Sequence, residues 1–119
     1  MILNDNFYKI LSITRVGNSA TISVELLPTH PIYAGHFPGQ PVVPGVCTLT
    51  IIKECIEKVL GRSTSYASIK ECKYISALIP EENLCITISV TIDEDKNVKA
   101  VVNRDSTQEA VLKLKAVIK

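Results

Sequence analysis

The sequence contains no tryptophan and almost no excess of one charge. Its aromatic residues are four tyrosines and two phenylalanines, and 13 Lys and Arg against 12 Asp and Glu give a formal net charge of +1. Nucleic-acid-binding proteins need a basic field to hold phosphates, and single-strand binders also need aromatic side chains on which bases stack. Because both features are lacking, the composition argues against a nucleic-acid partner.

A long apolar run that could cross a membrane is also lacking. The uncharged stretch 28–52 contains five prolines and both histidines, which a membrane-spanning helix would not tolerate. Residues 1–10 show no basic stretch followed by an apolar one, which is the mark of a secretory signal. We therefore expect a cytoplasmic protein without a membrane span.

Closely spaced cysteine pairs are absent too. The four cysteines, Cys47, Cys55, Cys72 and Cys85, are 8, 17 and 13 positions apart. Structural zinc sites use closely spaced ligand pairs, and two histidines without a neighbouring acidic or cysteine cluster are too few for another metal centre. We expect no metal, and reduced thiols that pack as small hydrophobic side chains. Cys47, which is near a histidine-bearing segment, is an alternative candidate nucleophile.

The chain is long enough for one folded domain. It has 119 residues, of which 46% are hydrophobic and 21% are charged, and these proportions exclude a disordered chain. We expect residues 1–119 to form a single domain.

The alternation of apolar and polar residues predicts six strands. Gly17 and Asn18 predict a hairpin turn between the first two strands. The cleanest alternation is that of the fourth strand, where isoleucine and valine alternate with threonine and serine. The expected strands are Tyr8–Arg15, Thr21–Leu26, Tyr66–Leu78, Ile86–Ile92, Val98–Arg104 and Ala110–Ile118.

One long helix is predicted from about Val46 to Leu60, with Gly61 as its C-terminal cap. Its first half is rich in residues of low helix propensity, so burial must stabilise it. Apolar residues cover most of its surface. The economical arrangement is an α+β fold in which an antiparallel sheet, polar on its far face, wraps around this central helix. The polar strip of the helix is limited to Thr50, Glu54, Glu57 and Lys58.

The segment 28–45 differs from the rest of the sequence. It holds both histidines, five of the six prolines and three of the five glycines. Pro44 and Gly45 lead directly into the predicted helix, whose first amides lack intrahelical acceptors. A histidine base beside such amides suits chemistry next to a carbonyl, because the base removes a proton while the amides hold the enolate-like oxygen.

Residues 35–46, GHFPGQPVVPGV, closely resemble the GHFPGxPVMPGV signature of the 3-hydroxyacyl-acyl-carrier-protein dehydratases, which are hot-dog-fold enzymes of fatty-acid and polyketide synthesis. Residues 69–74 and 79–84 resemble the strand and turn that follow the helix in that family. The resemblance implies a lyase that dehydrates a (3R)-hydroxyacyl thioester of acyl carrier protein to the trans-2-enoyl thioester. It implies no cofactor beyond the phosphopantetheine that arrives with the carrier protein.

The same resemblance assigns roles to individual residues. His36 matches the catalytic base that removes the proton at C2, and it would be oriented by the main-chain carbonyl of Val42. Gly45 matches the glycine whose backbone amide polarises the thioester carbonyl. In the family two hot-dogs pair side by side with the acyl tunnel between them, and the histidine and the acid come from different subunits. The implied substrate-binding residues are Phe37, Val42, Pro44 and Val46.

The sequence departs from the family at the general acid. The family has Glu or Asp fourteen residues after the histidine, where this chain has Thr50. A threonine hydroxyl is far too weakly acidic to protonate a leaving hydroxyl near neutral pH, although it can orient a water. Glu54, about 5 Å further along the same helix strip, is the candidate substitute acid. The alternative interpretation of Glu54 is a partly solvated charge that pairs with Lys58 at i+4.

Three functions are compatible with this pattern. The chain could be a dehydratase subunit of a heterodimer whose second hot-dog subunit supplies the missing carboxylate. It could be a homodimeric dehydratase in which His36 handles both proton transfers or Glu54 supplies the acid. It could also be a non-catalytic subunit that binds or scaffolds the acyl carrier protein. A thioesterase is a further alternative, although hot-dog thioesterases generally use a carboxylate to activate water and lack this loop.

Overall fold

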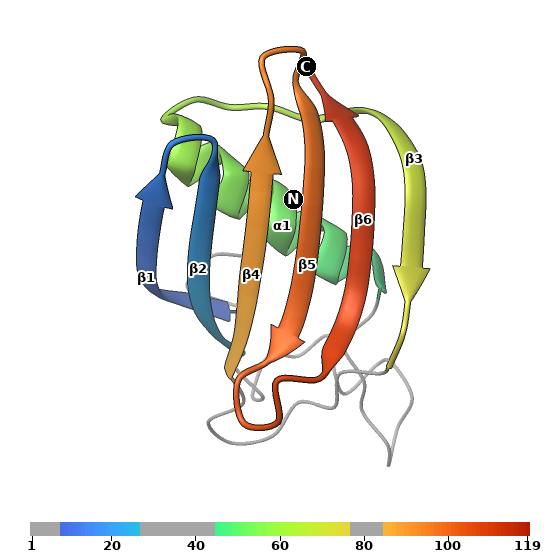
Figure 1. Ribbon diagram of the computed structural model, residues 1–119. Helices are drawn as coiled ribbons and strands as arrows, with labels where there is room; N and C mark the ends of the chain where they lie inside the picture. Colours follow the sequence, from blue (N-terminus) through green and yellow to red (C-terminus); the bar gives the residue numbers. More distant parts are fainter. Residues whose placement is uncertain (1–7, 27–44, 77–84) are drawn as a thin grey trace.

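The computed structural model describes residues 8–26, 45–76 and 85–119, which form six strands and one helix (Figure 1). Every pair of neighbouring strands in this described part is antiparallel, and the strand order is β1-β2-β4-β5-β6-β3. Helix α1 crosses one face of the sheet, which confirms the expected α+β architecture. The elements are β1 (Tyr8–Val16), β2 (Ser19–Leu26), α1 (Gly45–Leu60), β3 (Tyr66–Tyr74), β4 (Cys85–Ile92), β5 (Asn97–Arg104) and β6 (Ala110–Ile118).

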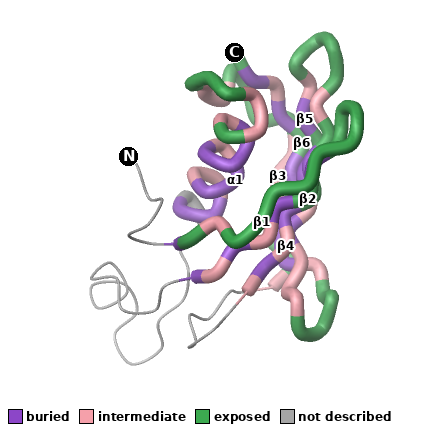
Figure 2. The backbone as a smooth tube through the Cα atoms, turned by 90° about the vertical axis from the view of Figure 1, so that its left-hand side faces the viewer, coloured by how far each residue is buried: buried purple, intermediate pink, exposed green. Residues whose placement is uncertain are grey.

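The strand registers build the core in rows that run across the sheet. One such row joins β2, β4, β5 and β6 through directly opposite residues, and each of its side chains is buried. The alternate residues of the same strands, among them Thr21, Ser89 and Thr91, are exposed on the other face. Buried and exposed residues thus alternate along these strands, as the period of two requires of a sheet that is covered on one face. Figure 2 shows α1 packed beside the sheet. The buried row consists of Ile22, Ile88, Val102 and Leu112.

Two glycines adopt the left-handed backbone conformation where the sequence predicts turns. Gly17 has a φ of 58° in the β1–β2 turn, and Gly61 has a φ of 72° directly after α1. A side chain at such a φ is strained, which is why glycine is favoured at both places. The amide of Gly61 donates to the carbonyl oxygen of Glu57 at 2.8 Å and thereby ends the helix.

Strand β3 is shorter than the sequence suggested. It ends at Tyr74 instead of Leu78. The amides of Ile75 and Ser76 both donate to the carbonyl oxygen of Val111, at 2.8 and 3.3 Å, so two donors share one acceptor and the ladder stops there. The predicted turn at residues 80–83 lies outside the described residues.

The two edge strands of the sheet, β1 and β3, expose apolar side chains. An edge strand also presents unpaired backbone groups, which another strand can pair with. Both edges therefore offer apolar surface together with backbone donors and acceptors. The exposed large hydrophobic residues in the described part are Leu11, Ile13 and Val16 on β1, and Ile69, Tyr74 and Ile75 on or just after β3.

Candidate functional site

The N-terminus of α1 lies where the sequence predicts the site. The helix begins at Gly45, which is the last residue of the proline-rich segment 28–45. The first amides of an α-helix have no acceptor within the helix, and the dipole at that end favours negative charge. The backbone amide of Gly45, the first residue of α1, is therefore one of the amides without an acceptor inside the helix.

The described residues include only part of the predicted site. Gly45, Thr50 and Glu54 lie on α1. The side chain of Val46 is not among the described ones, although its backbone is part of the helix. Four further predicted site residues lie outside the described residues: His36, Phe37, Val42 and Pro44.

Thr50 and Glu54 lie one helical turn apart on α1, and their surroundings differ. Thr50 is half-buried, whereas Glu54 is buried at 8% exposure. The phenolic hydroxyl of Tyr8 donates a hydrogen bond to Oε1 of Glu54, with an O–O distance of 2.9 Å. Tyr8 is the first residue of β1 and is fully buried. A contact between residues 46 positions apart thus ties the start of the sheet to the middle of the helix.

The interpretation of Glu54 as a solvated partner of Lys58 is wrong. Glu54 is buried and accepts the bond from Tyr8, while Lys58 is exposed. Among the described residues, the i,i+4 ion pair of the helix joins Lys53 Nζ to Glu57 Oε1 at 3.5 Å. Burial of a carboxylate costs about several kcal/mol unless hydrogen bonds replace its water, and a bond to a charged group returns about 1.5–3 kcal/mol. The burial of Glu54 therefore costs folding free energy, at a position where the side chain faces the first residue of β1.

A second tyrosine contacts the helix from the opposite edge of the sheet. The hydroxyl of Tyr66, the first residue of β3, donates to the main-chain oxygen of Leu49 at 2.7 Å. Burial is the main cause that raises the pKa of Tyr66, with smaller contributions from nearby thiols. Tyr8 and Tyr66, which lie on the two edge strands, thus hold the part of α1 between Leu49 and Glu54 by one hydrogen bond each. Sequence patterning did not single out either tyrosine, because a strand pattern does not show which distant element its first residue meets.

The thiols of the described residues are free and suited to packing rather than to nucleophilic attack. Cys47 and Cys55 are buried, while Cys72 and Cys85 are half-buried. Burial raises the pKa of Cys47, and it raises the pKa of Cys55 to about 12 with a further contribution from Glu54. Because the thiolate is the reactive form, these shifts argue against Cys47 as a nucleophile.

Metal-binding and membrane-spanning features were sought in the same part of the chain. In residues 8–26, 45–76 and 85–119, no group of three or more His, Cys, Asp and Glu side chains could hold a metal ion. None of the described helical residues forms a helix long and apolar enough to cross a membrane.

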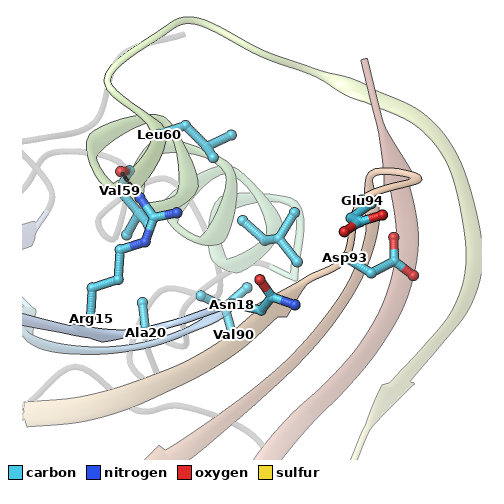
Figure 3. Close-up of a pocket in the computed structure, with 9 residues that line it drawn as sticks. Arg15, Asn18, Ala20, Val59, Leu60, Val90, Asp93 and Glu94 are labelled. Atoms are coloured by element: carbon cyan, nitrogen blue, oxygen red, sulfur yellow. Dashed lines mark hydrogen bonds between the residues drawn. The ribbon is translucent and has the colours of Figure 1, made fainter.

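A pocket of about 200 Å³ lies at the other end of the helix (Figure 3). Arg15 reaches from β1 to this end, and its Nη1 donates to the main-chain oxygen of Val59 at 3.1 Å. Asp93 and Glu94 lie on the far side of the pocket from Arg15. Since α1 has 16 residues, this pocket is about 20 Å from Gly45. It is therefore far from the N-terminus of α1, where Gly45 lies.

Comparison with known families identifies the chain's relatives. The family model described as ApeI dehydratase (ApeI-like) matches residues 12–113. The chain belongs to the ApeI-like dehydratase family. The match includes all of α1, β2, β3, β4 and β5, together with the later part of β1 and the first part of β6.

Curated relatives of this ApeI-like chain are 3-hydroxyacyl-[acyl-carrier-protein] dehydratases named FabZ. The FabZ of Syntrophomonas wolfei is 29% identical over 97 residues, which cover 76% of this chain and 65% of that protein. The FabZ of Ehrlichia canis is 32% identical over 85 residues, which cover 62% of this chain and 57% of that protein. The chain thus spans 65% or less of the length of these two relatives.

Solved structures similar to this ApeI-like chain establish its fold. The dehydratase heterocomplex ApeI:P from Xenorhabdus doucetiae aligns with a TM-score of 0.79 at 22% identity, covering 92% of this chain and 95% of that one. The (R)-hydratase from A. caviae involved in PHA biosynthesis aligns with a TM-score of 0.62 at 14% identity, covering 89% and 96%. The chain has the hot-dog fold, as its sequence resemblance implied.

Proposed function

We propose that the chain is a hot-dog subunit of a cytoplasmic dehydratase that acts on (3R)-hydroxyacyl thioesters of acyl carrier protein and forms the trans-2-enoyl thioester. The pathway would be a fatty-acid or polyketide/polyene-type synthesis. The observation that carries the proposal is that α1 starts at Gly45, within the last two residues of the GHFPGQPVVPGV motif. The family match over residues 12–113 and the FabZ relatives support the same reaction class.

In this proposal the motif supplies the catalytic base and the backbone amide that stabilises the thioester oxygen. His36 removes the proton at C2 of the substrate, with its ring oriented by the main-chain oxygen of Val42. The backbone amide of Gly45 holds the thioester oxygen as negative charge develops on it, which lowers the barrier to proton removal. The pantetheine arm of the carrier protein is part of the substrate. The acyl chain would be bound by Phe37, Val42, Pro44 and Val46.

We further propose that two hot-dog subunits pair to complete the site. Support comes from β3, an edge strand among the described strands, because Ile69 and Tyr74 on β3 and Ile75 directly after it are exposed. The similar structure from Xenorhabdus doucetiae is a heterocomplex of two proteins. Thr50 in the acid position is a reason to test a second, different hot-dog subunit as the partner.

The decisive experiment is hydration of a trans-2-enoyl thioester, which is the reverse reaction, followed by loss of enoyl absorbance. The purified chain and its His36→Ala variant are assayed side by side, alone and with candidate hot-dog partners. We expect activity in at least one of these assemblies and its loss by about 100-fold or more in the variant. Activity that survives in His36→Ala would contradict the assignment of the base.

A second candidate function is a non-catalytic subunit that binds or scaffolds the acyl carrier protein. Thr50 favours it, because a threonine cannot act as the acid. Under this alternative, His36→Ala leaves the activity of the assembled complex intact while the chain still binds the carrier protein. Release of free thiol from the same acyl thioester in that assay would instead indicate a thioesterase.

A further inference from the structure

We infer that Glu54, held by Tyr8, supplies the proton that Thr50 cannot, and that Tyr8 is the positioning residue of this acid. The inference rests on the proposed dehydratase function and deepens it. It assigns the acid to this chain, so that two copies pairing side by side would hold His36 from one copy and Glu54 from the other.

The first argument is the burial of Glu54. The side chain is 8% exposed in the middle of a helix whose neighbouring residues, Cys55 and Ile56, are fully buried. Glutamine or leucine would fill this place without the cost of dehydrating a carboxylate. The presence of an acid where either of these residues would avoid that cost points to a functional role for the acid.

The second argument is the origin of its hydrogen bond. Tyr8 donates to Oε1 of Glu54 at 2.9 Å, and the ring of Tyr8 is itself fully buried at the start of β1. A rigid aromatic donor fixed by the sheet restricts the carboxyl group far more than an exposed lysine could. General acids need this kind of restriction, because small misplacements of a catalytic group cost large factors in rate.

The third argument is the place of Glu54 on the helix. It lies four residues after Thr50, which is about one helical turn along the axis and nearly in line on the same face. The half-buried Thr50 therefore lies between Glu54 and the N-terminus of α1, where the backbone of Gly45 begins the helix. A water bound at the threonine hydroxyl can pass the proton of Glu54 to a leaving group at that end.

The chemical step balances with these groups alone. His36 accepts the proton from C2, the C2–H electrons form the C2–C3 double bond, and the C3–O bond breaks. The departing hydroxyl takes the proton of Glu54, directly or through the water at Thr50, and leaves as water. One proton then returns from His36 to Glu54 through solvent, so no oxidant, reductant or cofactor is consumed.

The test compares three variants in whichever assembly, the chain alone or the chain with a partner, hydrates a trans-2-enoyl thioester. Glu54→Gln keeps an oxygen that can accept the bond from Tyr8 but has no acidic proton. Tyr8→Phe keeps the ring and removes only the hydroxyl. The double variant reports whether the two side chains act as one unit.

We expect Glu54→Gln to lower kcat by about 100-fold or more, and Tyr8→Phe to lower kcat by about 10- to 100-fold with KM nearly unchanged. The double variant should be no slower than Glu54→Gln. The matched control is Tyr66→Phe, which removes the other tyrosine hydrogen bond to α1, at Leu49, and should leave kcat unchanged. Thermal unfolding of each variant shows that it remains folded.

The inference is overturned if Glu54→Gln leaves kcat unchanged in an active assembly, since the acid must then lie elsewhere, for example on a partner subunit. It is also overturned if Tyr8→Phe slows the Glu54→Gln enzyme as much as it slows the wild type, or if Tyr66→Phe slows the enzyme equally. Failure of the proposed function looks different, because His36→Ala would then be as active as the wild type or no assembly would be active.

Discussion

Glu54 and Glu57 lie three residues apart on α1 and have opposite surroundings. Glu54 is buried and accepts a hydrogen bond from Tyr8, 46 residues earlier in the chain. The side chain of Glu57 is 23% exposed and takes both of its partners from close by. These are Lys53 at 3.5 Å and the amide of Thr64 at 3.0 Å.

The difference shows how position around a helix decides the role of one residue type. Glu57 faces the loop that follows α1, where water screens its charge and its contacts are local. Glu54 faces the start of β1, where burial of a carboxylate is costly and the Tyr8 donor comes from a distant element. We therefore expect changes around Glu54 to have large effects and changes around Glu57 to have small ones.

The largest effect is expected from Tyr8→Ala. This change removes a fully buried aromatic ring and leaves Glu54 without the Tyr8 hydroxyl. We expect the free energy of unfolding to fall by about 3–5 kcal/mol, as measured by urea denaturation followed by circular dichroism. Glu57→Ala is the matched comparison, with an expected loss of about 1 kcal/mol. Equal losses for the two variants would break the contrast between the two glutamates.

A loss of stability at alkaline pH is expected from Cys55, the neighbour of Glu54. Its pKa is raised from 9.0 to about 12, chiefly by burial and further by Glu54, so folding favours the neutral thiol. The stabilisation is therefore complete below pH 9 and is lost as the pH rises from 9 toward 12. The full effect is on the order of 4 kcal/mol.

The measurement for Cys55 is the free energy of unfolding from pH 7 to about pH 10.5, compared between the wild type and Cys55→Ala. The difference between them isolates this thiol from other alkaline groups, among them Tyr66, whose pKa is also raised. The same comparison in Glu54→Gln should show a smaller alkaline loss. Identical pH slopes for the wild type and Cys55→Ala would refute the assignment.

A smaller effect is expected at the Glu57 end of the helix from Gly61→Ala. Gly61 has a φ of 72°, and its amide donates to the carbonyl oxygen of Glu57. No atom lies within 4 Å of the position that an alanine Cβ would take, so the cost is conformational. We expect a loss of about 1–2 kcal/mol, seen as a lower Tm. An unchanged or higher Tm would show that the cap does not matter.

The smallest effect is expected from Lys53→Met, which removes the ion pair with Glu57 and keeps the apolar stem. Both side chains of this pair are about one quarter exposed. We expect a loss of at most about 0.5 kcal/mol, which should disappear in 1 M NaCl. A loss above about 1 kcal/mol, or one that salt leaves unchanged, would mean that this pair is more shielded than its exposure indicates.

Local patterning predicted the elements of the fold well. The helix, the hairpin turn at Gly17 and the cap at Gly61 are where the sequence placed them. They could be predicted because each depends on neighbours within a few residues: hydrophobic period, turn residues and a glycine at a positive φ. The end of β3 was predicted four residues too late, since it depends on how Ile75 and Ser76 share the carbonyl of Val111 on another strand.

One residue of the candidate site could be placed in the fold from the sequence. Pro44 and Gly45 were predicted to lead directly into a helix from about Val46, and α1 begins at Gly45. The surroundings of Glu54 were not predictable. Glu54 belongs to the polar strip of the helix, and the residue types of that strip do not show which part of it the sheet covers. Neither Tyr8 nor Tyr66 carries a local signal for its contact with the helix.

By itself the sequence determined the element types, the turns, the family resemblance and the substitution of Thr50 for the acid, since these depend on residue identity and short spacings. The tertiary structure alone decided that Glu54 is buried and that Tyr8 is its donor. The physical reason is that burial and long-range hydrogen bonds depend on which elements pack together. The packing of α1 against the sheet brings residues 8 and 54, which are 46 positions apart in the sequence, into contact.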